Sequence, residues 1–166
     1  MSHPLPATTP AWTLTAVSYA SPDARRLTQA LRHEQLRMYG FADDPADTLA
    51  EEFTAPRGAF LIASAVGGPA LACGGWRTAG TGTAEIKRMY VDPVVRSRGL
   101  GRHILEALEE DAVSHGMAHA ILETGVRNHA ALSLYATCGY APVKSYVEGR
   151  NPDVNRAMRK ALQGHS

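Results

Sequence analysis

One short segment of the chain combines arginine and glycine in a pattern that could bind an anion. Residues 96–102 read Arg-Ser-Arg-Gly-Leu-Gly-Arg and stand between an apolar run that ends at Val91 and a helical pattern that begins near Leu100. The first amides of a helix have no partner within it, and the helix dipole adds about half a positive charge there, which together suit a phosphate or pyrophosphate. Gly99 and Gly101 would let the backbone come close to such a ligand, because no Cβ intervenes.

Two well-known nucleotide-binding motifs can be tested against these residues. A dinucleotide-binding fingerprint needs a third small residue three positions after the second glycine, where this chain has Ile104. The fingerprint should also follow a strand directly, but seven residues separate Val91 from Gly99. Glu123 does stand about where the ribose carboxylate of such a fold would be. A P-loop is excluded because no Gly-Lys-Ser/Thr follows. A pyrophosphate carrier bound by a longer loop remains, together with a tight turn that carries solvated arginines.

Two strings of residues place this segment in a wider pattern. The first, 84–93, reads Ala-Glu-Ile-Lys-Arg-Met-Tyr-Val-Asp-Pro and is followed by Arg-x-x-Gly-x-Gly over 96–101. The second, 128–140, reads Asn-x-x-Ala-x-x-Leu-Tyr-x-x-x-Gly-Tyr. In this order and at this distance they resemble the two motifs of the GNAT superfamily of acyl-CoA-dependent N-acyltransferases. The resemblance covers about 76–142 closely, and the rest of the chain only by the order of its elements.

The resemblance implies a fold and a cosubstrate. The fold would be a single mixed α/β (α+β) domain at 11–163, with about four helices around a mostly antiparallel sheet of six to seven strands that splays at its centre. Acetyl-CoA would be held by the amides of the first motif, and the backbone of Met89 and Val91 would pair with the pantetheine arm like an added strand. The acceptor-binding half would be 11–75, the coenzyme-binding core 76–142 and the C-terminal strands 143–163. The implied coenzyme-binding residues are Met89, Tyr90, Val91, Arg96, Ser97, Arg98, Gly99, Leu100, Gly101, Arg102, Asn128 and Tyr135.

Glu85 and Tyr135 are the residues expected to move protons. An alkylamine with a pKa of about 10.4 is protonated at neutral pH, so presenting its free base costs about 4 to 5 kcal/mol. The resemblance makes Glu85 the base, directly or through water, although it could instead pair with Lys87 on the same face of its strand. It places Tyr135 beside the coenzyme sulfur, where the phenol would donate to the leaving thiolate, unless 134–135 is only the apolar face of a helix. Asn128 would cap that helix or contact the coenzyme.

The acceptor should bind where the first two helices and their loop meet. Segment 41–52 contains five acids and no basic residue, which would suit a cationic small molecule but is also typical of a solvated loop. Arg37 could instead favour a carboxylate. We expect acetylation of the primary amine of an unidentified small molecule, by direct attack in a ternary complex. Acetylation of a protein or peptide and a noncatalytic acyl-CoA-binding module remain alternatives. The acids are Asp43, Asp44, Asp47, Glu51 and Glu52, and the further candidates are His33, Arg37, Tyr39 and Glu123.

The elements that must position these residues can be predicted from periodicity and turn residues. The apolar positions of 100–112 recur at helical spacing, with Gly116 just beyond the end. Gly67 and Gly68 join two apolar runs as a hairpin. A strand, loop, helix and strand then lie at the centre of the chain. The predicted strands are 12–18, 59–66, 69–76, 84–91, 118–123, 141–147 and 155–161; the predicted helices are 22–38, 100–115 and 129–137, with a short helical turn at 44–53.

Composition limits the remaining partners. Lysine and arginine number 17 against 16 acids, so no basic field favours nucleic acid. Cys73 and Cys138 show neither a CxxC spacing nor a neighbouring histidine, which predicts core residues in a reduced compartment. The seven histidines form no convincing metal pair, so no metal is expected. Residues 1–10 are expected to be disordered, and without a signal peptide or membrane span the protein is expected in the cytoplasm, with a homodimer left open.

Overall fold

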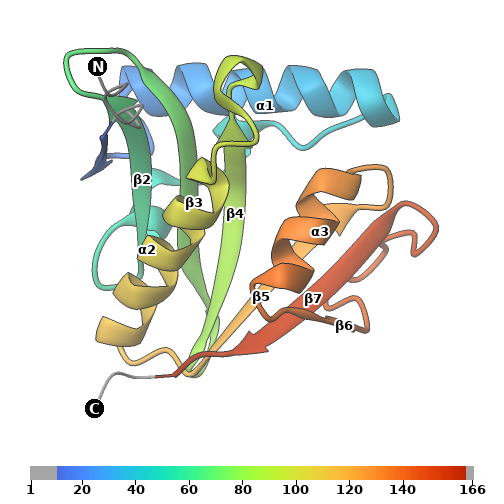
Figure 1. The fold of residues 1–166 in the computed structure, drawn as a ribbon. Helices are drawn as coiled ribbons and strands as arrows, with labels where there is room; N and C mark the ends of the chain where they lie inside the picture. Colours follow the sequence, from blue (N-terminus) through green and yellow to red (C-terminus); the bar gives the residue numbers. More distant parts are fainter. Residues whose placement is uncertain (1–10, 164–166) are drawn as a thin grey trace, which may run out of the picture.

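The computed structural model describes residues 11–163, so the prediction made for 1–10 lies outside the described residues. Within them the chain forms strands, α-helices and short 3₁₀ turns in the order that Figure 1 follows from blue to red. The strands are β1 (Trp12–Ala16), β2 (Gly58–Ala65), β3 (Ala70–Gly80), β4 (Thr83–Val91), β5 (His119–Gly125), β6 (Ala141–Val143) and β7 (Asn155–Ala161). The helices are α1 (Pro22–Tyr39), α2 (Leu100–Ser114) and α3 (His129–Thr137), and the turns are η1 (Pro45–Asp47), η2 (Ala50–Phe53) and η3 (Pro93–Val95).

The strands form a single seven-stranded sheet in the order β1-β2-β3-β4-β5-β7-β6. Every neighbouring pair is antiparallel except β4 and β5, which are parallel. These two strands pair only where Thr83–Glu85 meets His119–Ile121. Beyond that contact they diverge, as Figure 1 shows. The prediction of a mixed fold with a mostly antiparallel, centrally splayed sheet is therefore confirmed.

Two details of the predicted fold are wrong. The described residues contain three α-helices rather than about four, and the short helical turn predicted at 44–53 is present as the two 3₁₀ turns η1 and η2. The backbone turns extended at Thr48, with φ −97° and ψ 130°, and the next turn starts only after Leu49. The predicted strand 141–147 stops at Val143. The residues that follow form an irregular loop, from which Tyr146 and Arg150 make side-chain contacts with other parts of the chain.

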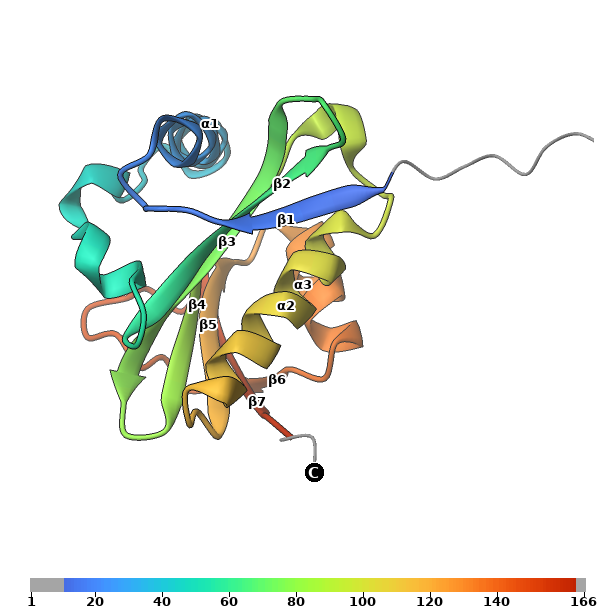
Figure 2. The same cartoon turned by 90° about the vertical axis from the view of Figure 1, so that its left-hand side faces the viewer.

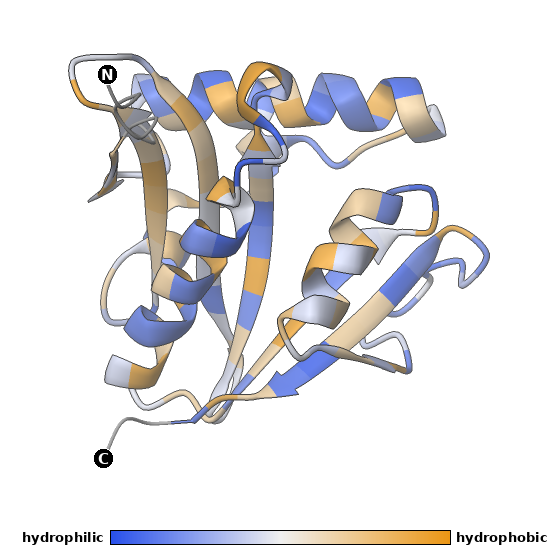
Figure 3. Cartoon of the chain, in the orientation of Figure 1, coloured by the Kyte–Doolittle hydropathy of each residue, from blue (hydrophilic) through white to orange (hydrophobic). Residues whose placement is uncertain are grey.

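The helices cover both faces of the sheet. Figure 2 shows α1 on one face and α2 with α3 on the other. The apolar stripe of α2, which includes Ile104, Leu105 and Leu108, is fully buried against the sheet. On the opposite face α1 buries Leu27 in a second cluster with aromatic residues such as Phe53. Figure 3 shows α1 alternating between hydrophilic and hydrophobic residues, as expected for a helix with one face on a core.

A β-bulge bends β4 beside the point where the sheet divides. Cys73 lies opposite Tyr90 and Gly75 lies opposite Lys87, so β4 has one more residue than β3 between these pairs. Arg88 takes up the extra length with a φ of 60°, which is unusual for a residue with a Cβ. The bulge packs closely on β3. A Cβ at Gly74 would lie 2.4 Å from Sδ of Met89 and 3.1 Å from Cγ2 of Ile104.

The Gly74→Ala variant should be less stable than the wild type. The added methyl group must displace Met89 and press on the buried side of α2, and such overpacking costs about 1 to 3 kcal/mol in the free energy of unfolding. Urea denaturation would measure it. Gly68→Ala is the matched control, since its Cβ would have no neighbour closer than 3.5 Å, and it should change stability by less than about 0.5 kcal/mol. Equal stability of the two variants would contradict the packing of the bulge.

Candidate active site

A cavity of ≈ 530 Å³ opens where β4 and β5 diverge. Its walls come from the last turns of α1, β4, the loop before α2, the end of β5 and α3. Beyond Glu85, no strand among residues 11–163 pairs with β4 on the side that faces β5. Met89 and Val91 line the cavity along this stretch, so their backbone could pair with an extended ligand arm.

The loop at one end of the cavity has the geometry that the sequence predicted for anion binding. Gly99 is the N-cap of α2 with a left-handed φ of 79°, and no side chain caps the helix. The first amides of α2 therefore keep their hydrogen-bonding capacity for a ligand. Leu100 is buried below them, while Gly101 lines the cavity. Ser97, with a φ of 66°, helps the loop turn toward the helix.

The three arginines of the loop are less uniformly available than predicted. Arg96 pairs with Glu34 of α1, and its Nε donates to the Val91 carbonyl at 2.8 Å. Arg102 pairs with Glu106 at 3.0 Å on the exposed side of α2. Arg98 is exposed and has no acidic partner among residues 11–163. Arg96 and Arg102 line the cavity and Arg98 does not, so the helix end supplies the positive charge that a ligand in the cavity would meet without breaking an ion pair.

Tyr135 and Asn128 reach the same cavity from α3. Tyr135 is only 6% exposed, and its ring packs edge-on against Tyr140 at 5.8 Å between centroids. Burial raises the pKa of the Tyr135 phenol, so it stays protonated well above neutral pH. The Asn128 side chain accepts from the Ala131 amide at 3.1 Å and so caps α3, as one of the two predicted roles requires.

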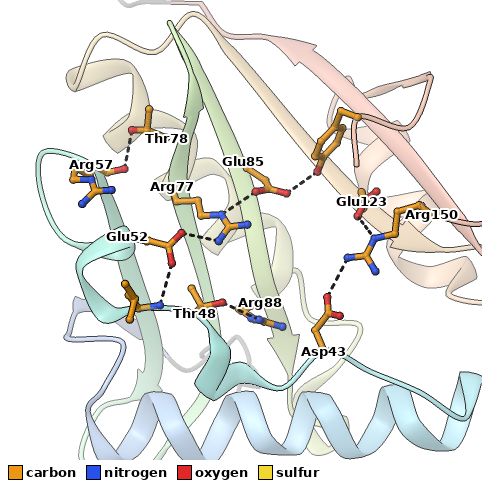
Figure 4. A network of polar contacts seen from close by, with 12 residues as sticks. Asp43, Thr48, Glu52, Arg57, Arg77, Thr78, Glu85, Arg88, Glu123 and Arg150 are labelled. Carbon is orange, nitrogen blue, oxygen red and sulfur yellow. Dashed lines mark hydrogen bonds and ion pairs between the residues drawn. The ribbon is translucent and has the colours of Figure 1, made fainter. Parts of the chain in front are cut away.

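Glu85 is buried and engaged by two partners. One carboxylate oxygen accepts from Arg77 Nε at 2.9 Å, and the other accepts from the Tyr146 hydroxyl at 2.8 Å. Figure 4 shows Arg77 held between Glu52 and Glu85. Glu85 therefore pairs with Arg77 rather than with Lys87, the partner that the strand alternation suggested. Burial and the neighbouring Glu85 charge raise the pKa of Tyr146.

Glu123, at the end of β5, lies in the cavity wall opposite Glu85. Arg150 Nε is 3.3 Å from Glu123 Oε2, and Arg150 Nη2 donates to Asp43 at 3.1 Å, a bridge that Figure 4 shows. The other oxygen, Oε1, is buried without a partner among the described residues. Burial raises the pKa of the Glu123 carboxyl above its ordinary value, Arg150 opposes this, and the Glu85 charge adds to it.

The predicted acceptor residues divide into two groups. A second cavity of ≈ 480 Å³ shares Glu85, Lys87, Arg88, Asp43 and Arg150 with the first. The predicted acids Asp44 and Asp47 line the second cavity as well, and Tyr39 lines the first; His33, Arg37, Glu51 and Glu52 line neither.

Sequence reasoning missed Tyr146 and Arg150. They lie on the loop between β6 and β7, which has no periodicity that could have indicated a role. Cys73 is buried and Cys138 is half-buried, both as free thiols. Residues 11–163 contain no group of three His, Cys, Asp or Glu side chains placed to hold a metal. No helix in this range is long and apolar enough to cross a bilayer.

The sheet is open and divides around a cavity, with a glycine-capped helix end on one side and carboxylates on the other, which is the arrangement that the resemblance to the GNAT superfamily implied. The profile of the Acetyltransferase (GNAT) family matches residues 24–140, and the chain belongs to that family. The resemblance of its two motifs is thereby confirmed.

The chain matches its curated relatives over less than half of their length, and solved structures share its fold. An IAA acetyltransferase of Azospirillum brasilense is 40% identical over 60 residues, which cover 36% of this chain and 39% of that protein. A Klebsiella pneumoniae structure, provisionally described as an acyl-CoA N-acyltransferase, is 26% identical with a TM-score of 0.78 and covers 93% of this chain and 100% of that one. A provisionally described acetyltransferase from Salmonella typhimurium, solved with its cofactor acetyl-CoA, is 20% identical with a TM-score of 0.70 and covers 94% of this chain and 96% of that one.

Proposed function

We propose that the protein transfers the acetyl group of acetyl-CoA to the primary amine of a small molecule, by direct attack within a ternary complex. The observation that carries this proposal is the meeting of two cavities at β4. The first runs from the open end of α2 to Glu85 and Glu123, and the second reaches Glu85 from the side of η1. Two ligands that enter from different sides could therefore meet beside a carboxylate.

The residues present fit acetyl-CoA at the first cavity. The uncapped amides of α2 suit its pyrophosphate, and Arg96 and Arg102 line the cavity beside them. The free side of β4 at Met89 and Val91 suits the amide groups of the pantetheine arm. When bound, the thioester supplies an acetyl group that is activated toward attack by a neutral amine.

For the proton of the attacking amine, the geometry favours Glu123 over Glu85. Both oxygens of Glu85 already accept hydrogen bonds, so Glu85 would have to release Tyr146 or Arg77 before it could take a proton. Glu123 has an oxygen without a partner and a pKa raised above its ordinary value, so it can take a proton without releasing another residue from that oxygen. We therefore propose Glu123 as the base, directly or through water. The base role predicted for Glu85 stays as the alternative, with positioning of Arg77 and Tyr146 as its other role.

Tyr135 is proposed as the donor to the leaving sulfur. Its hydroxyl makes no hydrogen bond with any residue in 11–163, and its side chain lines the first cavity. Because burial keeps the phenol protonated, it can donate a hydrogen bond as negative charge develops on the sulfur.

Calorimetry with acetyl-CoA and a free-thiol release assay over a panel of amines, amino acids and peptides would test the proposal. The wild type should bind acetyl-CoA saturably and release thiol in the presence of a small amine, with an acetylated product by mass spectrometry. Release only with peptides would favour a protein acetyltransferase. Binding without release on any acceptor would favour a noncatalytic module.

Gly101→Val should weaken acetyl-CoA binding by about 10- to 100-fold without unfolding the protein, the loss expected when bulk enters a binding cavity. A Cβ at this position meets only Leu134 at 3.4 Å and Val91 at 3.7 Å, so the valine methyl groups would extend toward the cavity. Gly68→Val makes the same substitution in the β2–β3 turn, far from either cavity, and should bind like the wild type. Unchanged affinity of Gly101→Val would contradict the placement of the pyrophosphate.

A further inference from the structure

The second cavity contains more acids than are available to a ligand. Asp43 pairs with Arg150 at 3.1 Å, and Asp44 lies 3.6 Å from Arg32. Glu85 pairs with Arg77 at 2.9 Å. Asp47 is the exception, since it is exposed and has no cationic partner among residues 11–163. Most acids of the second cavity therefore already form ion pairs within the protein, and they are not available to bind a cationic acceptor.

Two cations in the same cavity lack a counter-charge. Lys87 forms no ion pair and no side-chain hydrogen bond within the described part of the chain. Arg88 donates from Nη2 to the Thr48 hydroxyl at 3.2 Å, and Figure 4 shows these two side chains together. No carboxylate lies within ion-pair distance of Arg88 in 11–163, and its Nε is buried without a partner. Both cations line both cavities.

Such cations are costly unless a ligand pairs with them. Lys87 and Arg88 are half-buried, and a half-buried charge without a partner loses part of its hydration with nothing in the protein to replace it. Burial lowers the pKa of Lys87, and the Glu85 charge offsets this only in part. A guanidinium presents its donors as a planar fork that matches a carboxylate, and an ammonium beside it adds a second charge. The bulge in β4 brings Lys87 and Arg88 together, because it inserts the extra residue at Arg88, where the two cavities meet.

Resting on the proposed function, we propose that the acceptor is an amino acid or a similar small amine that carries a carboxylate, bound by Arg88 and Lys87. Both cations line the first cavity together with Glu123, the proposed base. The amine and the carboxylate of one small molecule could therefore be bound in this cavity at the same time.

The test compares acceptors that differ only in the carboxylate. The wild-type enzyme would be assayed by thiol release with α-, β- and γ-amino acids, and each amino acid would be compared with its carboxamide and its decarboxylated amine. We expect kcat/KM to be on the order of 10- to 100-fold higher for at least one acid than for its two analogues, the range typical of a charge-assisted contact. This comparison needs no variant and does not depend on how a mutant folds.

Variants of Arg88 and Lys87 then test whether these two cations cause the preference for the acid over its analogues. Arg88→Gln and Lys87→Met should reduce the preference for the acid to about threefold or less by raising KM for the acid, while the decarboxylated amine is affected little. Arg88→Lys should recover part of the preference, since it restores the charge without the fork. Arg57→Gln is the control, because Arg57 is exposed and lines neither cavity, and it should keep the full preference.

The outcomes separate this inference from the proposed function. Acetylation of the amines or carboxamides as fast as the acids would overturn the inference and leave the proposed function in place. Acetylation of peptides alone would overturn both. A preference for the acid that survives both Arg88→Gln and Lys87→Met would overturn its assignment to these residues. If the wild type did not bind acetyl-CoA, the proposed function itself would be contradicted.

Discussion

Glu123→Gln is expected to lower kcat by about 10²- to 10⁴-fold, the usual contribution of a general base. The amide keeps the size of the side chain and its contact with Arg150 but cannot take a proton from the amine. In the wild type, the active carboxylate forms as the pH rises through a pKa that lies above its ordinary value of 4.5. The acidic limb of the kcat/KM profile should therefore lie above that pH, and it should be absent from the variant.

Glu85→Gln is the matched comparison on the other side of the cavity. Its amide oxygen can still accept from Arg77, but the contact with the Tyr146 hydroxyl is weakened, so a smaller loss of about tenfold or less is expected. The acidic limb should persist in this variant. Steady-state kinetics between about pH 5 and 9 would distinguish the two carboxylates. The reverse ranking, with the limb lost in Glu85→Gln and kept in Glu123→Gln, would return the base role to Glu85.

Tyr135→Phe is expected to lower kcat by about 10²-fold while the affinity for acetyl-CoA changes by less than about twofold. The variant removes one hydroxyl and keeps the ring that packs on Tyr140, so the wall of the cavity is preserved. Because burial raises the pKa of this phenol, its donor function should not be lost as the pH rises from about 7 to 9. Turnover measured at saturating acetyl-CoA, with affinity from calorimetry, separates the two effects.

Tyr140→Phe provides the control from the same aromatic pair. The Tyr140 hydroxyl donates to Glu109 at 2.7 Å, and the residue does not line the first cavity. Its removal should cost about 1 kcal/mol of stability with kcat close to that of the wild type. Equal turnover by Tyr135→Phe and Tyr140→Phe would remove the donor assignment from Tyr135.

Arg150 connects three parts of the chain at the acceptor side of the site. It joins the β6–β7 loop to Asp43 after α1 and to Glu123 in β5. This bridge contributes to the environment of the proposed base, since the Arg150 charge opposes the rise in the pKa of Glu123. The ion pair with Asp43 also occupies one of the acids that would otherwise favour a cationic acceptor. The loop therefore affects both the proton transfer and the charge that an acceptor meets.

The order of the elements and the location of the coenzyme loop could be predicted from the amino acids alone. The helical spacing of 100–112, the Gly67–Gly68 turn and the glycines at 99 and 101 are local signals, and each acts within a short stretch of chain. The same locality explains why the sequence indicated the cap formed by Asn128, whose acceptor lies three residues from its donor. It also explains why the helical turn at 44–53 could be predicted from Asp44 and Pro45, although its division into two 3₁₀ turns could not.

Which charged groups are available at the site depends instead on contacts between distant parts of the chain. The contact between Tyr146 and Glu85 joins residues 61 positions apart, and that between Arg150 and Asp43 joins residues 107 positions apart. No local pattern can specify such partners, because they depend on how the β6–β7 loop folds back over β4 and β5. The bulge at Arg88 could not be predicted from the sequence either, since arginine rarely adopts a positive φ. The partial burial of Glu123 and the lack of an ion-pair partner for Lys87 and Arg88 likewise depend on the tertiary structure, and the chemistry proposed for the acceptor depends on both.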